Sequence, residues 1–190
     1  MTWILASQSA RRRHLLSLLG LEFSVFHPEL SEQIDIAKLD ESMRTLAVAK
    51  ACDAQRRFSQ GISIGCDTAV FCQGQCLGKP VNREQAGTML RTLSGKTHSV
   101  ISALALVDLA KSYCVSGLER TLVRFRVLSA DDIERYLDGN EYQDKAGAYG
   151  VQDQGAVLVA QMIGCYTNVI GFPVSLFLEL KREIEAALTP

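Results

Sequence analysis

The sequence predicts a mixed α/β fold in which a twisted sheet is flanked by helices. Short apolar runs, typical of strands, alternate along the 190 residues with amphipathic segments that are typical of helices. Some neighbouring strands are separated only by a turn such as Gln73-Gly74, which joins antiparallel strands and argues against a purely parallel sheet. No internal repeat, low-complexity tract or flexible linker divides the chain. Its length therefore fits one large domain or two small lobes.

Hydrophobic spacing and turn residues define the elements of the first half of the chain. Ser9 is a good N-cap, and Gly20 a suitable stop, for a helix with a stripe of leucines at Leu15, Leu16, Leu18 and Leu19. Apolar residues recur at helical spacing along Asp40–Phe58. We expect helices between Ser9 and Gly20, at Asp40–Phe58 and at Arg83–Leu93, and strands at Trp3–Ala6, Glu22–Phe26, Ile62–Cys72 and Gln75–Leu77.

The second half of the chain contains longer alternating segments and one unusual loop. Ser129, followed by Asp131 and Asp132, is typical of a capped helix start. The polar segment 140–152 carries two glycines among charged residues, a composition common in binding loops. We expect strands at Thr97–Leu106, Tyr113–Leu128 and Gly155–Met162, a short helix after Ser129, a loop at Tyr166–Pro173 and a closing helix at Val174–Leu188.

The bulk properties exclude several classes of protein. The net charge is −1, so no overall basic field attracts nucleic acid, and we expect no nucleic-acid partner. No apolar run approaches the roughly 20 residues of a membrane span, and no signal peptide is recognisable. We therefore expect a cytoplasmic protein without a membrane partner. The six cysteines form no CxxC pair, which argues against a zinc site or a disulfide framework.

The turn and helix that follow Trp3–Ala6 combine serines with three consecutive arginines. Cations in the first turn of a helix are unfavourable by about 0.3–1 kcal/mol each when exposed. Arg11 and Arg12 are easier to explain if an anion lies over that turn, where free backbone N–H groups and the Ser7 hydroxyl also point. The alternative is a solvated basic helix start.

Two charged residues stand in apolar surroundings. Lys50 falls on the apolar stripe of its helix, where a lysine usually extends its amine to solvent; alternatively it points into a cleft toward phosphate. Asp67 lies in the middle of the apolar segment 62–72, where an unpaired carboxylate is very costly. We expect Asp67 to face a cleft and bind a divalent cation, with a structural salt bridge as the alternative.

Further charges could join the same site. Lys79 leaves the predicted hairpin beside the Asp67 strand. Glu32, in a polar loop, is a second candidate carboxylate for a metal, although such an acidic loop is usually just solvated. Cations with one or two carboxylates suit a metal-assisted attack on a phosphate chain. No Walker A, GxGxxG or GxSxG sequence is present, which argues against P-loop kinases, dinucleotide oxidoreductases and common serine hydrolases.

Six fragments follow one another along almost the whole chain: LASQSARRRHLL, GCDTAV around Asp67, GKP at Lys79, SGKTHSV from Ser94, DKAGAYGVQ from Asp144 and NVIGFP from Asn168. With these fragments in this order, the chain resembles the Maf family of nucleoside triphosphate pyrophosphatases. This resemblance implies a single Maf-like domain over 1–190, with two lobes and a central cleft, similar to the inosine triphosphate pyrophosphatases. The implied reaction cleaves a nucleoside triphosphate between the α and β phosphates, with a divalent cation.

The resemblance also implies roles for residues of the matching motifs. Asp67 would be the acidic catalytic residue, and Glu32 would help it with metal or water. Substrate would be bound by Ser7, Arg11, Arg12, Lys50, Lys79 and Gln152. The implied cofactor is Mg²⁺ or Mn²⁺, and the implied assembly is a homodimer.

The KAGAYGVQ segment resembles the branch of the family that acts on dTTP and UTP. The substrates would then include modified pyrimidine nucleotides, and the role would be cleansing of the nucleotide pool. Two alternatives remain open. One is the branch that acts on methylated GTP. The other is a non-catalytic nucleotide-binding regulator of septum formation. Asp67 favours an enzyme, because a pocket that only binds anions gains nothing from a carboxylate beside phosphate.

Overall fold

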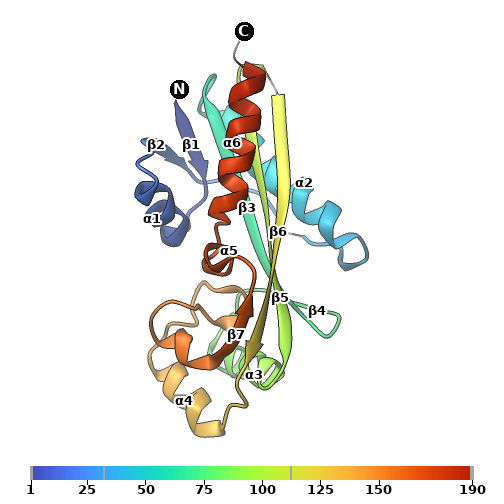
Figure 1. Ribbon diagram of the computed structural model, residues 1–190, viewed down its shortest axis with the longest axis vertical. Coiled ribbons are helices and arrows are strands. Elements are labelled where there is room, and N and C mark those ends of the chain that lie inside the picture. Colours follow the sequence, from blue (N-terminus) through green and yellow to red (C-terminus); the bar gives the residue numbers. More distant parts are fainter. Residues whose placement is uncertain (1, 32, 112, 189–190) are drawn as a thin grey trace. The chain divides into compact units, whose positions relative to one another are not determined.

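The computed structural model describes residues 2–31, 33–111 and 113–188. Its sheet has the strand order β2-β1-β3-β5-β6-β7, and β4 pairs with β3 (Figure 1). β1 is parallel to β2 and β3, whereas β3–β4 and β6–β7 are antiparallel. The mixed sheet is thus confirmed. Its strands are β1 (Trp3–Ala6), β2 (Phe23–Phe26), β3 (Ile62–Cys72), β4 (Gln75–Leu77), β5 (Thr97–Asp108), β6 (Tyr113–Phe125) and β7 (Val159–Ile163).

The helices separate the strands along the chain. They are α1 (Ala10–Leu18), α2 (Leu39–Asp53), α3 (Arg83–Leu93), α4 (Ala130–Asp138), α5 (Tyr166–Ile170) and α6 (Val174–Leu188). The predicted caps are present: the Ser9 hydroxyl accepts from the Arg12 amide, and Ser129 forms a reciprocal capping box with Asp132. None of these helices, among the residues described, is long and apolar enough to span a bilayer.

The chain divides into two compact units. Unit 1 comprises residues 1–67, 102–119 and 171–190, and unit 2 comprises 68–101 and 120–170. β3, β5 and β6 each contribute residues to both units. Because the chain passes from one unit to the other within these strands, neither unit is a continuous stretch of sequence.

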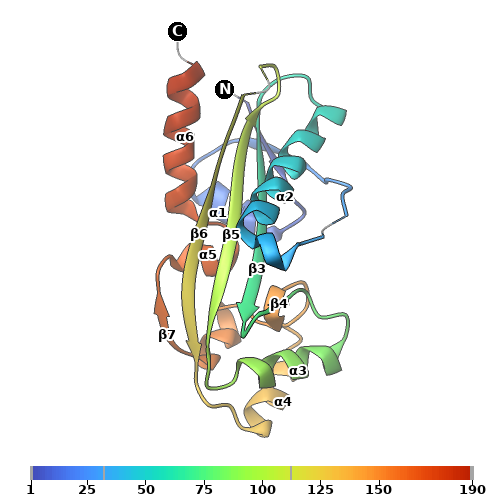
Figure 2. The ribbon, with the colours of Figure 1, turned by 90° about the vertical axis from the view of Figure 1, so that its right-hand side faces the viewer.

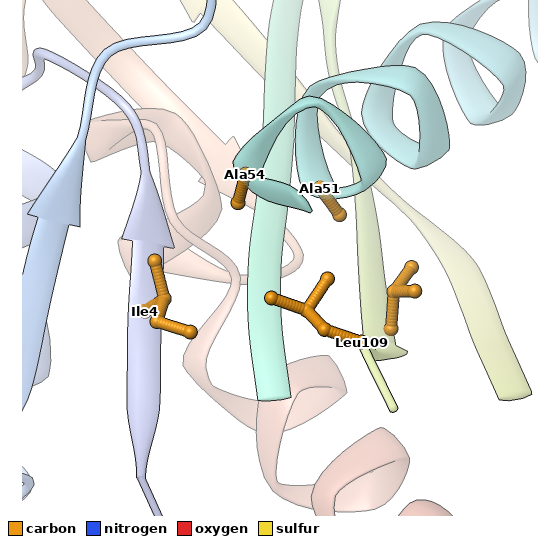
Figure 3. Packing of buried hydrophobic residues seen from close by; sticks show 5 residues of the cluster. Ile4, Ala51, Ala54 and Leu109 are labelled. Atoms are coloured by element: carbon orange, nitrogen blue, oxygen red, sulfur yellow. The ribbon is translucent and has the colours of Figure 1, made fainter. Parts of the chain in front are cut away.

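In unit 1, helices cover both faces of the strands. α2 and α6 lie on opposite sides (Figure 2). Ala51 and Ala54 at the end of the α2 segment point toward Ile4 and Leu109, with which they form a buried apolar cluster (Figure 3). On α6, Phe177 meets the ring of Trp3 edge-on, with 5.8 Å between the ring centroids.

The approach of α2 to β3 is very close at Gly65. A Cβ atom at this position would lie 1.9 Å from the carbonyl oxygen of Ala47 and 2.7 Å from the amide nitrogen of Ala51. Only a glycine allows the helix backbone to come this near to the strand. Gly65 therefore sets the height of α2 above β3, and with it the position of every side chain that α2 directs at this strand.

Unit 2 is held together by contacts among its own segments. α3 and α4 lie side by side, and Arg83 donates hydrogen bonds to Glu134 at 2.8 Å and to Asp138 at 2.7 Å. The buried amide of Asn168 donates to the carbonyl of Val100 and to the hydroxyl of Thr121, both at 3.0 Å. The NVIGFP fragment thus anchors α5 to β5 and β6.

Three local predictions were wrong. Residues 153–158 form 3-10 turns instead of the first half of the predicted strand Gly155–Met162, because Gly155 packs against the backbone of Gly150. The predicted loop at Tyr166–Pro173 begins with the short helix α5. Leu18 was placed on the leucine stripe of the first helix, but it is exposed, and the buried residues of α1 are Leu15 and Leu16.

Gly65→Ala is expected to lower the free energy of unfolding by about 3 kcal/mol, because the added methyl group meets helix backbone that cannot rotate away. Urea unfolding followed by circular dichroism measures the change. The control is Gly78→Ala, where an added Cβ has no atom within 4 Å. If the two variants were equally stable, the packing of α2 on β3 would not depend on the close contact at Gly65.

Candidate functional site

The end of β1 and the middle of β3 bring sequence-distant polar groups to the same level in unit 1. The two strands are parallel, and Ala6 is paired with Gly65. The next residues are Ser7, immediately after β1, and Cys66 and Asp67 within β3. Ser7 and Asp67 are both buried. The register of a parallel strand pair thus explains why these two predicted site residues belong to one neighbourhood.

Arg12 connects the segments around this point. Its Nη1 donates to the Ser7 hydroxyl at 3.0 Å and to the Cys66 carbonyl at 2.7 Å, and its Nε donates to the Gly171 carbonyl at 2.9 Å. The Ser7 hydroxyl also accepts from the Ser9 amide at 3.2 Å. Arg12 therefore fixes the peptide immediately before Asp67, and its planar guanidinium suits this because its donors have a rigid geometry.

Lys50 reaches Asp67 from α2. Its Nζ lies 2.5 Å from Oδ1 of Asp67, and the residues are 4% and 7% exposed. Of the two alternatives for Lys50, extension to solvent is wrong: α2 lies close to β3, and the amine is buried against the Asp67 carboxylate. The salt bridge considered as the alternative for Asp67 is therefore present, and a cleft with a divalent cation at Asp67 stays a prediction.

The electrostatics of this pair are those of a buried site. Removing two charges from water carries a large desolvation penalty, which their mutual attraction offsets only with good geometry. A pair of this kind is weak evidence for stability alone. It does keep an ionised carboxylate in apolar surroundings, where that carboxylate interacts more strongly with a nearby charge than it would in water.

The donor set near Asp67 fits a hard cation held in part by its substrate. Among residues 2–31, 33–111 and 113–188, no group of three or more His, Cys, Asp or Glu side chains could hold a metal. Mg²⁺ needs no such cage, because it commonly binds through one or two carboxylates, substrate phosphates and water. Glu32, the second predicted carboxylate, lies outside the described residues.

Unit 2 brings together the segments of the other two predicted residues, Lys79 and Gln152. The amide of Gly147 donates to the carbonyl of Gly78 at 3.0 Å, which ties the 145–152 loop to the residue before Lys79. Lys79 is exposed and Gln152 is half-buried. Gly147 has a φ of +70°, and a Cβ there would lie 3.0 Å from Val70, so this contact requires a glycine.

Unit 1 thus gathers Ser7, Arg12, Lys50 and Asp67 through direct contacts or adjacent peptides, and Arg11 is the half-buried neighbour of Arg12. Sequence reasoning did not foresee the Arg12 hydrogen bonds to backbone carbonyls. It also assigned no role to His98, although Nε2 of its ring lies 2.7 Å from the Tyr149 hydroxyl. The only sequence signal for Arg12, His98 and Tyr149 was that each lies in one of the six motif fragments.

A buried lysine–carboxylate pair beside an arginine-rich helix start has the chemical groups that can bind a phosphate and a divalent cation. The family model "Maf-like protein" matches residues 2–184, and the chain belongs to the Maf family. The resemblance inferred from the six fragments is thereby confirmed.

Curated relatives cover nearly the whole chain. A "dTTP/UTP pyrophosphatase" of Carboxydothermus hydrogenoformans is 40% identical over 179 residues, which cover 94% of this chain and 96% of that protein. One from Bacillus velezensis is 40% identical over 183 residues, or 95% of each chain. A third, from Desulforamulus reducens, is 43% identical over 176 residues, covering 90% and 91%.

Among solved structures, the chain is similar to a "Nucleoside-triphosphatase / dITP/XTP pyrophosphatase" from Mycobacterium abscessus. The TM-score is 0.50 at 12% identity, with 100% of both chains covered. At this identity the likeness concerns the fold alone. It confirms the expected fold relation to inosine triphosphate pyrophosphatase-like proteins.

Lys50→Met is expected to lower the free energy of unfolding by about 3–5 kcal/mol, because it leaves the Asp67 carboxylate buried without compensation. The double variant Lys50→Met/Asp67→Asn should lose less, since it contains neither charge. Chemical denaturation measures both.

The matched control is Lys181→Met on α6, whose amine pairs with Glu185 at a partly exposed position. It should cost about 1 kcal/mol or less. If Lys50→Met cost no more than this control, the pair would not compensate buried charge.

Proposed function

We propose that this chain is a nucleoside triphosphate pyrophosphatase, which hydrolyses dTTP and UTP between the α and β phosphates to give the monophosphate and pyrophosphate. The observation that carries the proposal is the buried Lys50–Asp67 pair at 2.5 Å, with Arg12 fixing the peptide beside it. Membership of the Maf family and relatives named dTTP/UTP pyrophosphatases support it.

Asp67 is proposed as the catalytic carboxylate. It accepts a hydrogen bond from the attacking water and takes up a proton from it as the water oxygen bonds to phosphorus and the bond between the α and β phosphates breaks, releasing pyrophosphate. The Lys50 amine, on the same carboxylate, holds Asp67 in one orientation and adds positive charge where negative charge develops. A carboxylate serves this reaction only if cations offset its repulsion of the phosphates, and Lys50 and Arg12 supply two.

The substrate-binding residues are proposed to be Ser7, Arg11, Arg12, Lys50, Lys79 and Gln152. Backbone N–H groups at the start of α1, together with the two arginines, favour the phosphate chain. Arg12 has a second task, because its hydrogen bonds to Cys66 and Gly171 keep the site in register. Gln152 contacts the substrate from a loop that is tied to the segment of Lys79.

A divalent cation, Mg²⁺ or Mn²⁺, is proposed to bind between Asp67 and the substrate phosphates, with Glu32 as a second carboxylate. When bound, it stabilises the negative charge on the phosphates and on the leaving pyrophosphate. The single described carboxylate at this point fits a cation that takes most of its oxygen ligands from substrate and water.

The proposed substrate range includes modified pyrimidine nucleotides, and the proposed role is nucleotide-pool cleansing in the cytoplasm. Such a role needs a nucleoside triphosphate as the only partner of the site. The resemblance further suggests that the protein acts as a homodimer.

Asp67→Asn is expected to lower kcat for dTTP by about 10²–10⁴-fold, because the amide cannot accept the proton of the attacking water. Binding of dTTP should persist, since the proposed phosphate-binding side chains are unchanged. Steady-state kinetics measure the first effect and calorimetry with dTTP the second.

The control is Asp108→Asn, which replaces another buried aspartate of unit 1. Oδ1 of Asp108 accepts hydrogen bonds from the amides of Ala110 and Lys111, an interaction that the asparagine oxygen can keep. This variant should retain the wild-type rate. Full turnover by the Asp67→Asn variant would remove Asp67 from the catalytic role.

A further inference from the structure

The loop that carries Gln152 is held at two points within unit 2. At its start, the Gly147 amide bonds to the carbonyl of Gly78. Three residues before Gln152, Tyr149 directs its ring into the interior, where it is 5% exposed. Gln152 itself is only half-buried. The conformation of this segment therefore depends on what holds the Tyr149 ring.

Two aromatic side chains from neighbouring strands enclose that ring. Its centroid lies 4.7 Å from that of Phe125 on β6 and 5.4 Å from that of His98 on β5, in both cases edge-to-face. His98 and Phe125 also meet each other edge-to-face at 5.0 Å. Because the three rings are in mutual edge-to-face contact, the packing restricts the orientation of the Tyr149 side chain.

A hydrogen bond between His98 and Tyr149 accompanies this ring packing. Nε2 of His98 lies 2.7 Å from the hydroxyl oxygen of Tyr149, and the histidine is 2% exposed. Burial lowers the pKa of His98 to about 4 and raises the pKa of Tyr149, so both groups are neutral near pH 7. The bond therefore joins a neutral imidazole to a neutral phenol. Either group can be the donor, depending on which imidazole nitrogen carries the proton.

The histidine carries a stability cost at this position. Within the described part of the chain, its Nδ1 has no hydrogen-bond partner although it is buried. An unsatisfied buried nitrogen costs stability, whereas an apolar ring in its place would remove the partner of the buried Tyr149 hydroxyl. What the imidazole provides, and an apolar ring cannot, is the hydrogen bond to Tyr149.

We propose that His98 is a positioning residue for substrate: through the Tyr149 hydroxyl it holds the backbone of the 145–152 loop so that Gln152 is presented in its binding orientation. The inference rests on the proposed function only in assigning Gln152 to substrate contact. His98 itself touches no reacting atom. Its effect on the reaction passes through Tyr149 and then through Gln152.

A double-mutant cycle tests this chain of contacts. Tyr149→Phe removes the hydroxyl and keeps the ring, and it is made in the wild type and in the Gln152→Ala variant. In the wild-type background kcat/KM for dTTP should fall about tenfold, mainly through KM, whereas in the Gln152→Ala background the further loss should be less than about twofold. Thermal unfolding of each variant shows whether it is folded.

A purely structural role gives a different pattern. If Tyr149→Phe lowered kcat/KM by the same factor in both backgrounds, or had no effect in either, the positioning role would be overturned. His98→Phe should reproduce the pattern of Tyr149→Phe, since it keeps an aromatic ring and loses the same bond. Tyr136→Phe, at another buried tyrosine of unit 2, should leave kcat/KM within about twofold.

The design separates this inference from the proposed function. If the wild type bound dTTP but did not hydrolyse it, the proposed function would fail, and the same cycle would be run on the dissociation constant for dTTP. Loss of coupling in that measurement would overturn the positioning role independently. If the wild type did not bind dTTP at all, Gln152 would have no substrate to position and both would fail.

Discussion

The buried ion pair between Lys50 and Asp67 constrains much of unit 1. An isolated carboxylate inside an apolar strand is too costly to keep charged, so a cation must reach it from another element. α2 can deliver that cation only because Gly65 lets its backbone approach β3 closely. Arg12 then fixes the peptide before Asp67, so that both the charge and the orientation of the Asp67 carboxylate are set. The packing of unit 1 and its proposed chemistry share this requirement.

Much of the fold could be predicted from the sequence because its signals are local. β3 is a predominantly apolar segment, and the start of α4 is indicated by the Ser129 capping box. α5 could not be predicted: its placement depends on the buried Asn168 amide, which bonds to strands 47 and 68 residues away. Residues 155–158 were assigned to a strand, although contact between Gly155 and the Gly150 backbone decides their conformation. Tertiary contacts overrode local preference in both places.

The candidate site shows the same division. Asp67 was recognised from the cost of a charge in an apolar strand, and Arg11 and Arg12 from the cost of cations at a helix start. Spacing left the orientation of Lys50 open, because it places a side chain on one face of a helix without showing how near the next element lies. The partners of Arg12 and the His98–Tyr149 bond join residues 5, 54, 159 and 51 positions apart, and only one of these separations is local. Glu32 stays a prediction.

The central claim is that the bond between the α and β phosphates of pyrimidine nucleoside triphosphates is the one cleaved. The most direct measurement is ³¹P NMR of dTTP incubated with the purified protein and Mg²⁺, with UTP and methylated GTP in parallel. We predict dTMP and pyrophosphate from dTTP, the corresponding products from UTP, and slower cleavage of methylated GTP. Formation of dTDP and inorganic phosphate, or unchanged dTTP despite measurable binding, would contradict the account.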